Sequence, residues 1–105
     1  LGVETNAFAY KNKDFQIDLL IDRRDQVINL CEMKFSQSEY TIDKRYDEHL
    51  RERREQFRIL SGTKKSLYLT MVTTYGLKRN EYSGNIQNEI VADDLFVAEY
   101  FFVGL

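Results

Sequence analysis

The 105-residue sequence has no proline, no tryptophan, five glycines and one cysteine. Because the lone Cys31 cannot close an internal disulfide, the chain does not resemble a disulfide-stabilised secreted domain, and a cytoplasmic location is expected. There is no repeat and no low-complexity tract, so nothing indicates an internal linker. At this length the composition predicts one domain over residues 1–105.

Long apolar runs and a strong excess of one charge are also missing. No stretch approaches the roughly 20 apolar residues that cross a membrane, so no membrane partner is expected. The 15 Lys and Arg against 17 Asp and Glu give a formal charge of −2. That balance excludes nucleic-acid binding through bulk positive charge, and any such contact must come from a local patch.

The chain does contain enough apolar side chains for a folded core, since 43% of its residues are hydrophobic and 13% are aromatic. Residues 3–10, 15–22 and 27–35 read as extended segments separated by short polar turns. The second segment alternates with period two, as a half-buried strand does. These three segments predict an antiparallel meander.

Residues 42–60 predict one long amphipathic helix, with Thr41 as its cap and Asp43 in its first turn. Gly62 can end the helix in the left-handed conformation. The apolar positions that form one helical stripe are Ile42, Tyr46, Leu50, Phe57 and Leu60. This spacing predicts that the stripe packs on the sheet while the charged residues face solvent.

Residues 66–75 are almost continuously apolar, which predicts a strand covered on both faces. Residues 89–92 suit a last short strand. The apolar tail over residues 95–105 suits either a terminal helix after Asp93 and Asp94 or an edge strand. The predicted architecture is therefore α/β, with a mixed sheet, a three-stranded meander, one long helix and a following strand.

Three charged residues interrupt the apolar runs of the second and third predicted strands. Asp18 lies within IDLLI, and Glu32 and Lys34 lie within LCEMKF. A turn at residues 24–26 would place Asp18 opposite Glu32, with Lys34 about 7 Å further along the same face. Such a carboxylate pair either repels, raising the pKa of at least one member, or shares a divalent cation. The alternative is a salt-bridged set on a solvated sheet face.

The spacing of Asp18 and the Glu32-Met33-Lys34 triplet resembles the PD-(D/E)XK, or restriction-endonuclease-like, nuclease superfamily. The segments FQIDLLIDRRDQVINLCEMKFS and LYLTMVTTYGLKRNEYSG also resemble the C-terminal domain of bacterial AAA-type ATPases. The resemblance covers about residues 2–96. It implies a restriction-endonuclease-like core, here without the family's first helix, joined to an ATPase in a longer chain. Ile17 stands where the family often has proline.

The resemblance also implies a function. Asp18 and Glu32 would hold Mg²⁺ or Mn²⁺, the backbone carbonyl of Met33 would add a ligand, and Lys34 would be the catalytic lysine. The activity would be Mg²⁺-dependent hydrolysis of nucleic acid, with DNA as the expected substrate. The alternative is an inactive nuclease-like module that docks on or regulates the ATPase portion.

Basic residues outside this triplet suggest where nucleic acid would lie. Tyr75, Lys78 and Arg79 combine an aromatic ring with positive charge in one loop, and Arg54 lies on the charged helix. Each can contact backbone phosphate, and each can equally be an ordinary surface residue. A sheet face without its first helix, and the apolar tail, further suggest packing of the tail on the sheet or on a second copy, as in a homodimer.

Overall fold

In the computed structural model, which describes residues 5–92, five strands and one long helix form an α/β fold. The elements in chain order are β1 (Thr5–Lys11), β2 (Gln16–Arg23), β3 (Val27–Lys34), α1 (Lys44–Ser61), β4 (Ser66–Thr73), the 3₁₀ turn η1 (Ser83–Asn85) and β5 (Asn88–Val91). Every predicted element that lies within residues 5–92 is present. The apolar tail at residues 95–105 lies outside the described residues.

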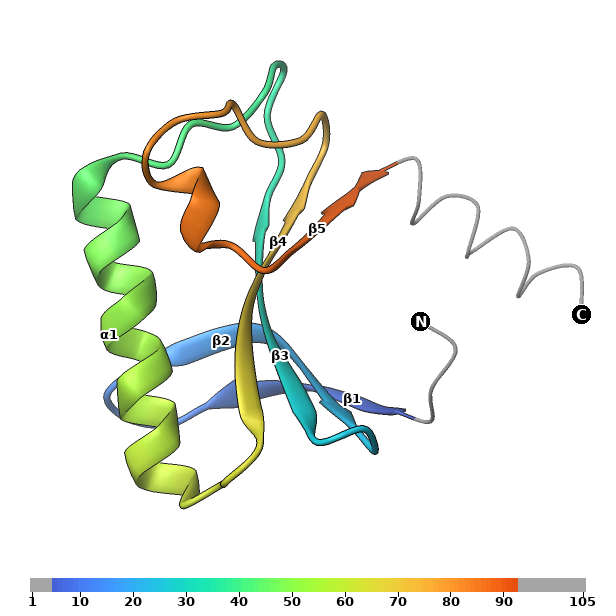
Figure 1. Ribbon diagram of the computed structural model, residues 1–105, viewed down its shortest axis with the longest axis vertical. Helices are drawn as coiled ribbons and strands as arrows, with labels where there is room; N and C mark the ends of the chain where they lie inside the picture. Colours follow the sequence, from blue (N-terminus) through green and yellow to red (C-terminus); the bar gives the residue numbers. More distant parts are fainter. Residues whose placement is uncertain (1–4, 93–105) are drawn as a thin grey trace, which may run out of the picture.

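The five strands form one mixed sheet in the order β1-β2-β3-β4-β5. β1, β2 and β3 pair antiparallel, which confirms the predicted meander, whereas β3, β4 and β5 run parallel. A parallel pair requires a crossover, and α1 supplies it between β3 and β4. Figure 1 shows α1 lying along one face of the sheet.

The ends of α1 are fixed by two local interactions. Asp43 is the N-cap, because its carboxylate accepts a hydrogen bond of 2.8 Å from the backbone N–H of Tyr46. The prediction of Thr41 as cap was therefore wrong by two residues: the aspartate next to the first helical turn satisfies the free N–H groups directly. Gly62 ends the helix at φ 66°, in the left-handed conformation that was expected.

The face of α1 that packs on the sheet differs from the predicted stripe at its end. Leu50 and Phe57 are buried and Tyr46 is half-buried, but Leu60 is 58% exposed. Leu60 lies in the last turn of the helix, after Phe57, which is the last buried residue of α1. The side chain that continues the buried stripe between Leu50 and Phe57 is Arg53.

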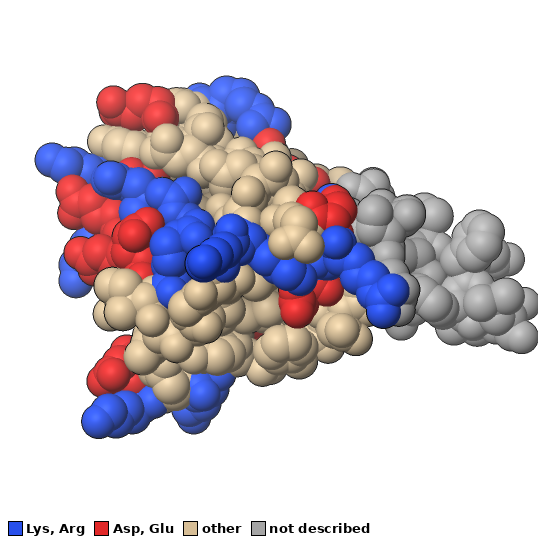
Figure 2. Space-filling view, turned by 60° about the horizontal axis from the view of Figure 1, so that its bottom comes forward, with Lys and Arg blue, Asp and Glu red and all other residues tan. Residues whose placement is uncertain are grey.

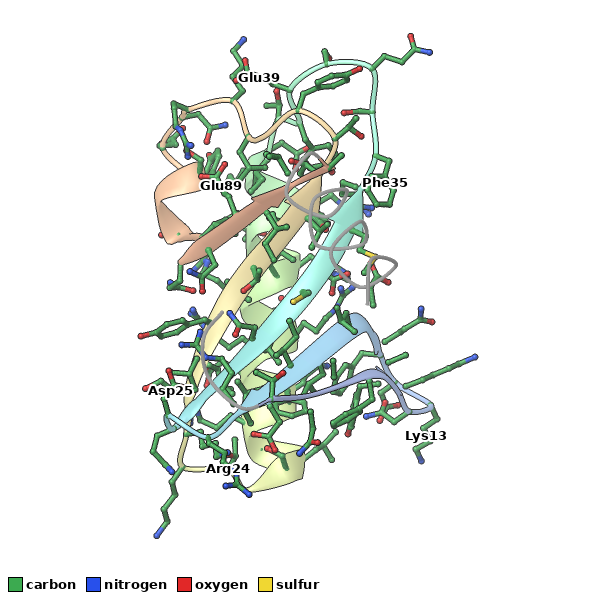
Figure 3. All side chains as sticks on the ribbon, turned by 90° about the vertical axis from the view of Figure 1, so that its right-hand side faces the viewer. Lys13, Arg24, Asp25, Phe35, Glu39 and Glu89 are labelled. Atoms are coloured by element: carbon green, nitrogen blue, oxygen red, sulfur yellow. The ribbon has the colours of Figure 1, made fainter. Side chains whose placement is uncertain are left out.

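The core lies mainly between α1 and the sheet. It forms two clusters: one holds Ile17, Leu20, Ile28, Leu30, Phe57 and Leu67, and the other holds Ile42, Leu50, Leu69, Met71 and Leu77. A third cluster of Ile21, Cys31 and Val72 lies on the other face, which Figure 3 views from the side away from α1. β4 is thus covered on both faces, as its continuous apolar run predicted.

A bulge in β2 changes the strict alternation expected from the sequence. The pairing between β1 and β2 shifts from Phe8–Leu20 to Tyr10–Ile17. Between these two pairs β2 therefore has one residue more than β1. As a result Ile17 and Leu20 join the same core cluster although they are three residues apart. The extra residue falls at Asp18 and Leu19, and bulges often re-aim side chains in this way.

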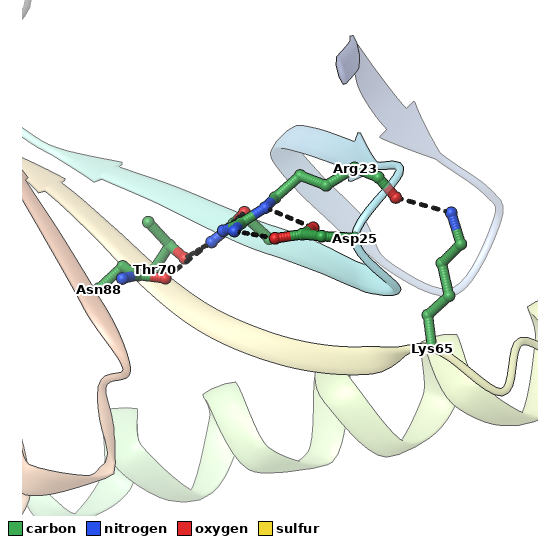
Figure 4. A network of polar contacts seen from close by, with 6 residues as sticks. Arg23, Asp25, Lys65, Thr70 and Asn88 are labelled. Carbon is green, nitrogen blue, oxygen red and sulfur yellow. Dashed lines mark hydrogen bonds and ion pairs between the residues drawn. The ribbon is translucent and has the colours of Figure 1, made fainter. Parts of the chain in front are cut away.

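Polar side chains link the end of the β2–β3 hairpin to the parallel strands (Figure 4). Arg23 donates to Asp25 and to Asn29, and Asn29 donates at 2.9 Å to both Thr70 Oγ1 and Asn88 Oδ1. We call these five residues the hairpin network. It ties β2, β3, β4 and β5 together through side chains.

Charges of both signs cover the surface at this end of the molecule. Figure 2 shows a band of Lys and Arg side chains with carboxylates beside it. Lys65 belongs to such mixed contacts, because its ammonium lies 2.7 Å from Asp22 Oδ1. No helix within residues 5–92 is long and apolar enough to cross a membrane.

Candidate functional site

The candidate site lies where β2 and β3 separate. Their ladder ends at the pair Leu19–Cys31, so the next residues, Asp18 and Glu32, stand on neighbouring antiparallel strands just beyond the last pair. Instead of a backbone partner, the N–H of Met33 donates to Asp18 Oδ2 at 3.0 Å. The Asp18 carboxylate therefore bridges the opening between the two strands and is held in place by β3.

Glu32 is a buried carboxylate, with only 6% of the residue exposed. It forms an ion pair with the guanidinium of Arg53, which reaches it from α1. Since α1 lies on one face of the sheet, this contact fixes the face to which Glu32 points. Cys31 points to the opposite face, where it joins the cluster of Ile21 and Val72.

Burial raises the pKa of Glu32 from 4.5 to about 7. Arg53 opposes this rise, whereas the nearby Asp18 carboxyl adds to it through a hydrogen bond and through its charge. The expected rise in the pKa of one carboxyl is thus confirmed, but desolvation is a larger cause than the repulsion on which the prediction rested. The interaction also shows that the two carboxyl groups lie close together.

Lys34 lies two residues beyond Glu32 on β3 and therefore points to the same face. Its ammonium stands 5.2 Å from the centre of the Tyr46 ring, on α1, in a cation–π contact. The prediction that Asp18, Glu32 and Lys34 share one face of the sheet agrees with these contacts. The ammonium is placed at the rim of the site, beside an aromatic wall.

Two buried polar atoms beside Glu32 have no hydrogen-bond partner among the described residues. They are Arg53 Nε and Tyr46 Oη. Another nitrogen of the Arg53 guanidinium contacts His49 Nε2, which must be the acceptor because arginine only donates. His49 is accordingly neutral, and both burial and Arg53 lower its pKa. Unpaired buried groups are costly and mark places where a structure departs from its most stable packing.

The donor set fits a hard divalent cation. Mg²⁺ commonly takes one or two protein carboxylates and completes its shell with water and substrate oxygens. Asp18 and Glu32 supply two carboxylates, and Met33 is the residue whose backbone carbonyl the family resemblance adds to the set. Among residues 5–92 no group of three or more His, Cys, Asp and Glu side chains converges, so a zinc-like cage is not present in the described part.

The four residues predicted to contact nucleic acid do not form one surface. Tyr75 is 60% exposed and, with Lys78 and Arg79, lies in the loop after β4; Arg79 is paired with Glu89. This loop is joined to the segment before α1, since the N–H of Lys78 donates to the carbonyl of Tyr40 at 2.9 Å.

The loop is also close to the site through aromatic contacts. Tyr40 packs edge-on against Tyr46, and Tyr46 in turn contacts Lys34. The loop and the site therefore share one end of the sheet. Arg54 is elsewhere on α1, half-buried and 3.9 Å from Glu55, its neighbour in the sequence.

Sequence reasoning missed Arg53 as a member of the site. The signal was available, because Arg53 lies seven residues after Tyr46, three after Leu50 and four before Phe57. These spacings place it on the buried stripe. A charged residue on such a stripe requires a buried partner, and Glu32 was the candidate on the facing sheet.

The chain matches no protein-family model, no curated protein and no solved structure.

Proposed function

We propose that this chain is a metal-dependent phosphodiesterase domain that cleaves nucleic acid, with DNA as the substrate and Mg²⁺ or Mn²⁺ as the cofactor. The observation that carries the proposal is the pairing of the Asp18 and Glu32 carboxyls at the β2–β3 fork with Lys34 on the same face. A bound divalent cation there would polarise the phosphate and supply a nucleophilic water. The family resemblance of these residues supports the same reading.

The chain's own residues would divide the remaining work. Asp18 is oriented by the backbone of Met33, so its free carboxylate oxygen is held at the fork. Lys34 points to the same face as Glu32, with its ammonium at the Tyr46 ring, and would orient an attacking water or stabilise charge that develops on phosphate oxygens. Tyr75, Lys78 and Arg79 lie in the loop at the same end of the sheet and would contact flanking phosphates.

The experiment is a nicking assay with supercoiled plasmid and the full chain in Mg²⁺ or Mn²⁺. We expect the wild type to nick the plasmid, chelator to stop the reaction, and Asp18→Ala to abolish both nicking and metal binding. Lys64→Ala removes an exposed lysine far from the fork and serves as the control. A folded wild-type chain that cleaves neither plasmid nor a single-stranded RNA would overturn the proposal.

A second candidate function is a catalytically inactive module that docks on or regulates the ATPase portion of a longer chain. The ion pair between Arg53 and Glu32 favours it, because a guanidinium already neutralises the carboxylate that a cation would need. This candidate predicts a folded chain that binds no Mn²⁺ at pH 8. It also predicts that Asp18→Ala leaves the chain folded and its association with the ATPase portion unchanged.

A further inference from the structure

We propose that Arg53 is a built-in counter-ion that guards the site, so that a divalent cation binds at Asp18 and Glu32 only when this arginine withdraws. The inference rests on the proposed metal site and describes its regulation. Arg53 comes from α1, whereas both carboxylates come from the β2–β3 fork. The guard and the ligands therefore belong to different layers of the fold.

The first argument is occupancy. One terminal nitrogen of Arg53 sits on Glu32 Oε1, and the side chains of the pair are 17% and 8% exposed. A ligand can approach a carboxylate so deeply buried from few directions, and Arg53 occupies one of them. A cation that approached with the guanidinium in place would meet a like charge at close range, in surroundings that screen it poorly.

The second argument is charge balance at the fork. When both carboxyls are ionised, as ligation of a cation requires, the two carboxylates and one guanidinium leave a single net negative charge. A divalent cation added to all three groups would leave an excess positive charge, whereas exchange of the guanidinium for the cation leaves the site neutral. Exchange is therefore the electrostatically favoured way to load the site.

The third argument is that Arg53 is held incompletely. Its Nε is buried without a partner among the described residues, and its second contact is the single acceptor nitrogen of His49 rather than another carboxylate. Full satisfaction of a guanidinium requires five donors to be paired. The Arg53 guanidinium therefore lacks some of the hydrogen bonds that it could form. A competing cation can displace it more easily for that reason.

The structure also offers Arg53 a place to go. His49 lies at the wall of an open hollow beside α1, which is also lined by three carboxylates, those of Asp43, Glu48 and Glu52, and by one guanidinium, that of Arg45. A guanidinium that pivots past His49 would leave the fork and enter this acidic hollow. Because its carboxylates outnumber its guanidinium, the hollow would favour the withdrawn position by charge.

The test is calorimetric titration of the full chain with Mn²⁺ at pH 8 and pH 8.5, because Arg53 lowers the pKa of Glu32 and its removal raises that pKa further above about 7. We expect Arg53→Gln to bind Mn²⁺ at least about tenfold more tightly than the wild type, equivalent to about 1.4 kcal/mol. Arg51→Gln is the matched control. It removes the same charge from the same helix, but its guanidinium is half-exposed on Asp47.

The outcomes separate this inference from the proposed function. Measurable binding by the wild type with equal or weaker binding by Arg53→Gln would overturn the guard alone. No binding by the wild type, by Arg53→Gln or by Arg51→Gln would overturn the metal site itself, and the guard with it. Tighter binding by Arg53→Gln and Arg51→Gln alike would show a general charge effect and would also overturn the guard.

A measurement on the wild type keeps the inference testable if Arg53→Gln does not fold. Nuclear magnetic resonance of the arginine Nε–Hε groups can follow Arg53 during a Mg²⁺ titration. We expect its resonance to shift and its hydrogen exchange with water to accelerate as metal binds, while that of Arg51 stays constant. Saturation with Mg²⁺ without any change at Arg53 would contradict withdrawal.

Discussion

Two polar clusters occupy opposite ends of the same β2–β3 pair, and they differ in how completely their atoms are paired. In the hairpin network, Asn29 uses both its amide nitrogen and its oxygen, and Thr70 also donates to the carbonyl of Tyr68. At the fork, two carboxyls stand together, and Arg53 Nε and Tyr46 Oη are buried without partners among the described residues.

The difference teaches how to distinguish a polar cluster that stabilises a fold from one that is kept for chemistry. A saturated network stabilises the strands that it joins and offers nothing to a ligand. A cluster with adjacent like charges, a raised pKa and unpaired donors is less stable than a saturated alternative, and such strain gathers at functional sites. This criterion supports the proposal that the fork is the functional end of the molecule.

The largest expected effect comes from removing the counter-ion of Glu32. Arg53→Met should lower the stability of the metal-free chain at pH 8 by up to about 3–5 kcal/mol, the limit for a buried carboxylate left unpaired; proton uptake by Glu32, whose pKa rises further without Arg53, reduces the loss. Denaturant unfolding monitored by circular dichroism measures this. The double variant Glu32→Gln with Arg53→Met should recover most of the loss, since both charges are then absent. A single variant as stable as the wild type would show that the ion pair contributes nothing.

The next effect is on cleavage. Lys34→Ala should reduce the rate of plasmid nicking by about 10²–10³-fold, the usual effect of losing one preorganised donor at a developing charge. Its Mn²⁺ affinity should change little, because Lys34 is not a ligand. Loss of metal binding and cleavage together would instead assign Lys34 to positioning of the carboxylates.

A substitution in the hairpin network should affect stability but neither metal binding nor cleavage, unlike a substitution at the fork. Asn29→Ala should lower stability by about 1–3 kcal/mol, because Thr70, Asn88 and Arg23 lose their shared partner. Mn²⁺ affinity per folded molecule and the nicking rate should stay at the wild-type level. A change in either would mean that the two ends of the β2–β3 pair are coupled.

The sequence predicted the position of the fork better than it predicted which side chains meet there. Period-two alternation identified β2 and β3, and their short turn set the register that ends at the pair Leu19–Cys31, directly next to Asp18 and Glu32. The bulge at Asp18 was not predictable, because it depends on pairing with β1, where the register shift occurs. Nothing local in the sequence of β2 encodes it.

The role of Arg53 was missed for a related reason. Its partner, Glu32, is 21 positions away in the chain and belongs to another layer, so helical spacing indicates that Arg53 is buried, but the packing of α1 on the sheet is needed to identify the pair. The saturated network shows the same limit, since Asn29 and Asn88 are joined across 59 positions. Strands and helices follow from local patterns, whereas polar partners depend on the tertiary fold.

The smallest effect, and the sharpest contrast between the two ends, is the pH dependence of stability. The folded state raises the pKa of Glu32 from 4.5 to about 7, so it holds this proton more tightly than the unfolded chain does. The Glu32 contribution to stability is therefore full below about pH 4.5 and is lost as the pH rises through 7. His49 acts in the opposite sense, because its lowered pKa makes the folded state lose stability as the pH falls.

Denaturant unfolding in chelator at pH 5 and pH 8 should be compared between the wild type and Glu32→Gln, because His49 is common to both. We expect the wild type to lose more stability between these two pH values than Glu32→Gln does, whereas Asn29→Ala should follow the wild type. Equal pH dependence in the wild type and Glu32→Gln would mean that Glu32 is ionised throughout and that Arg53 fully compensates its burial.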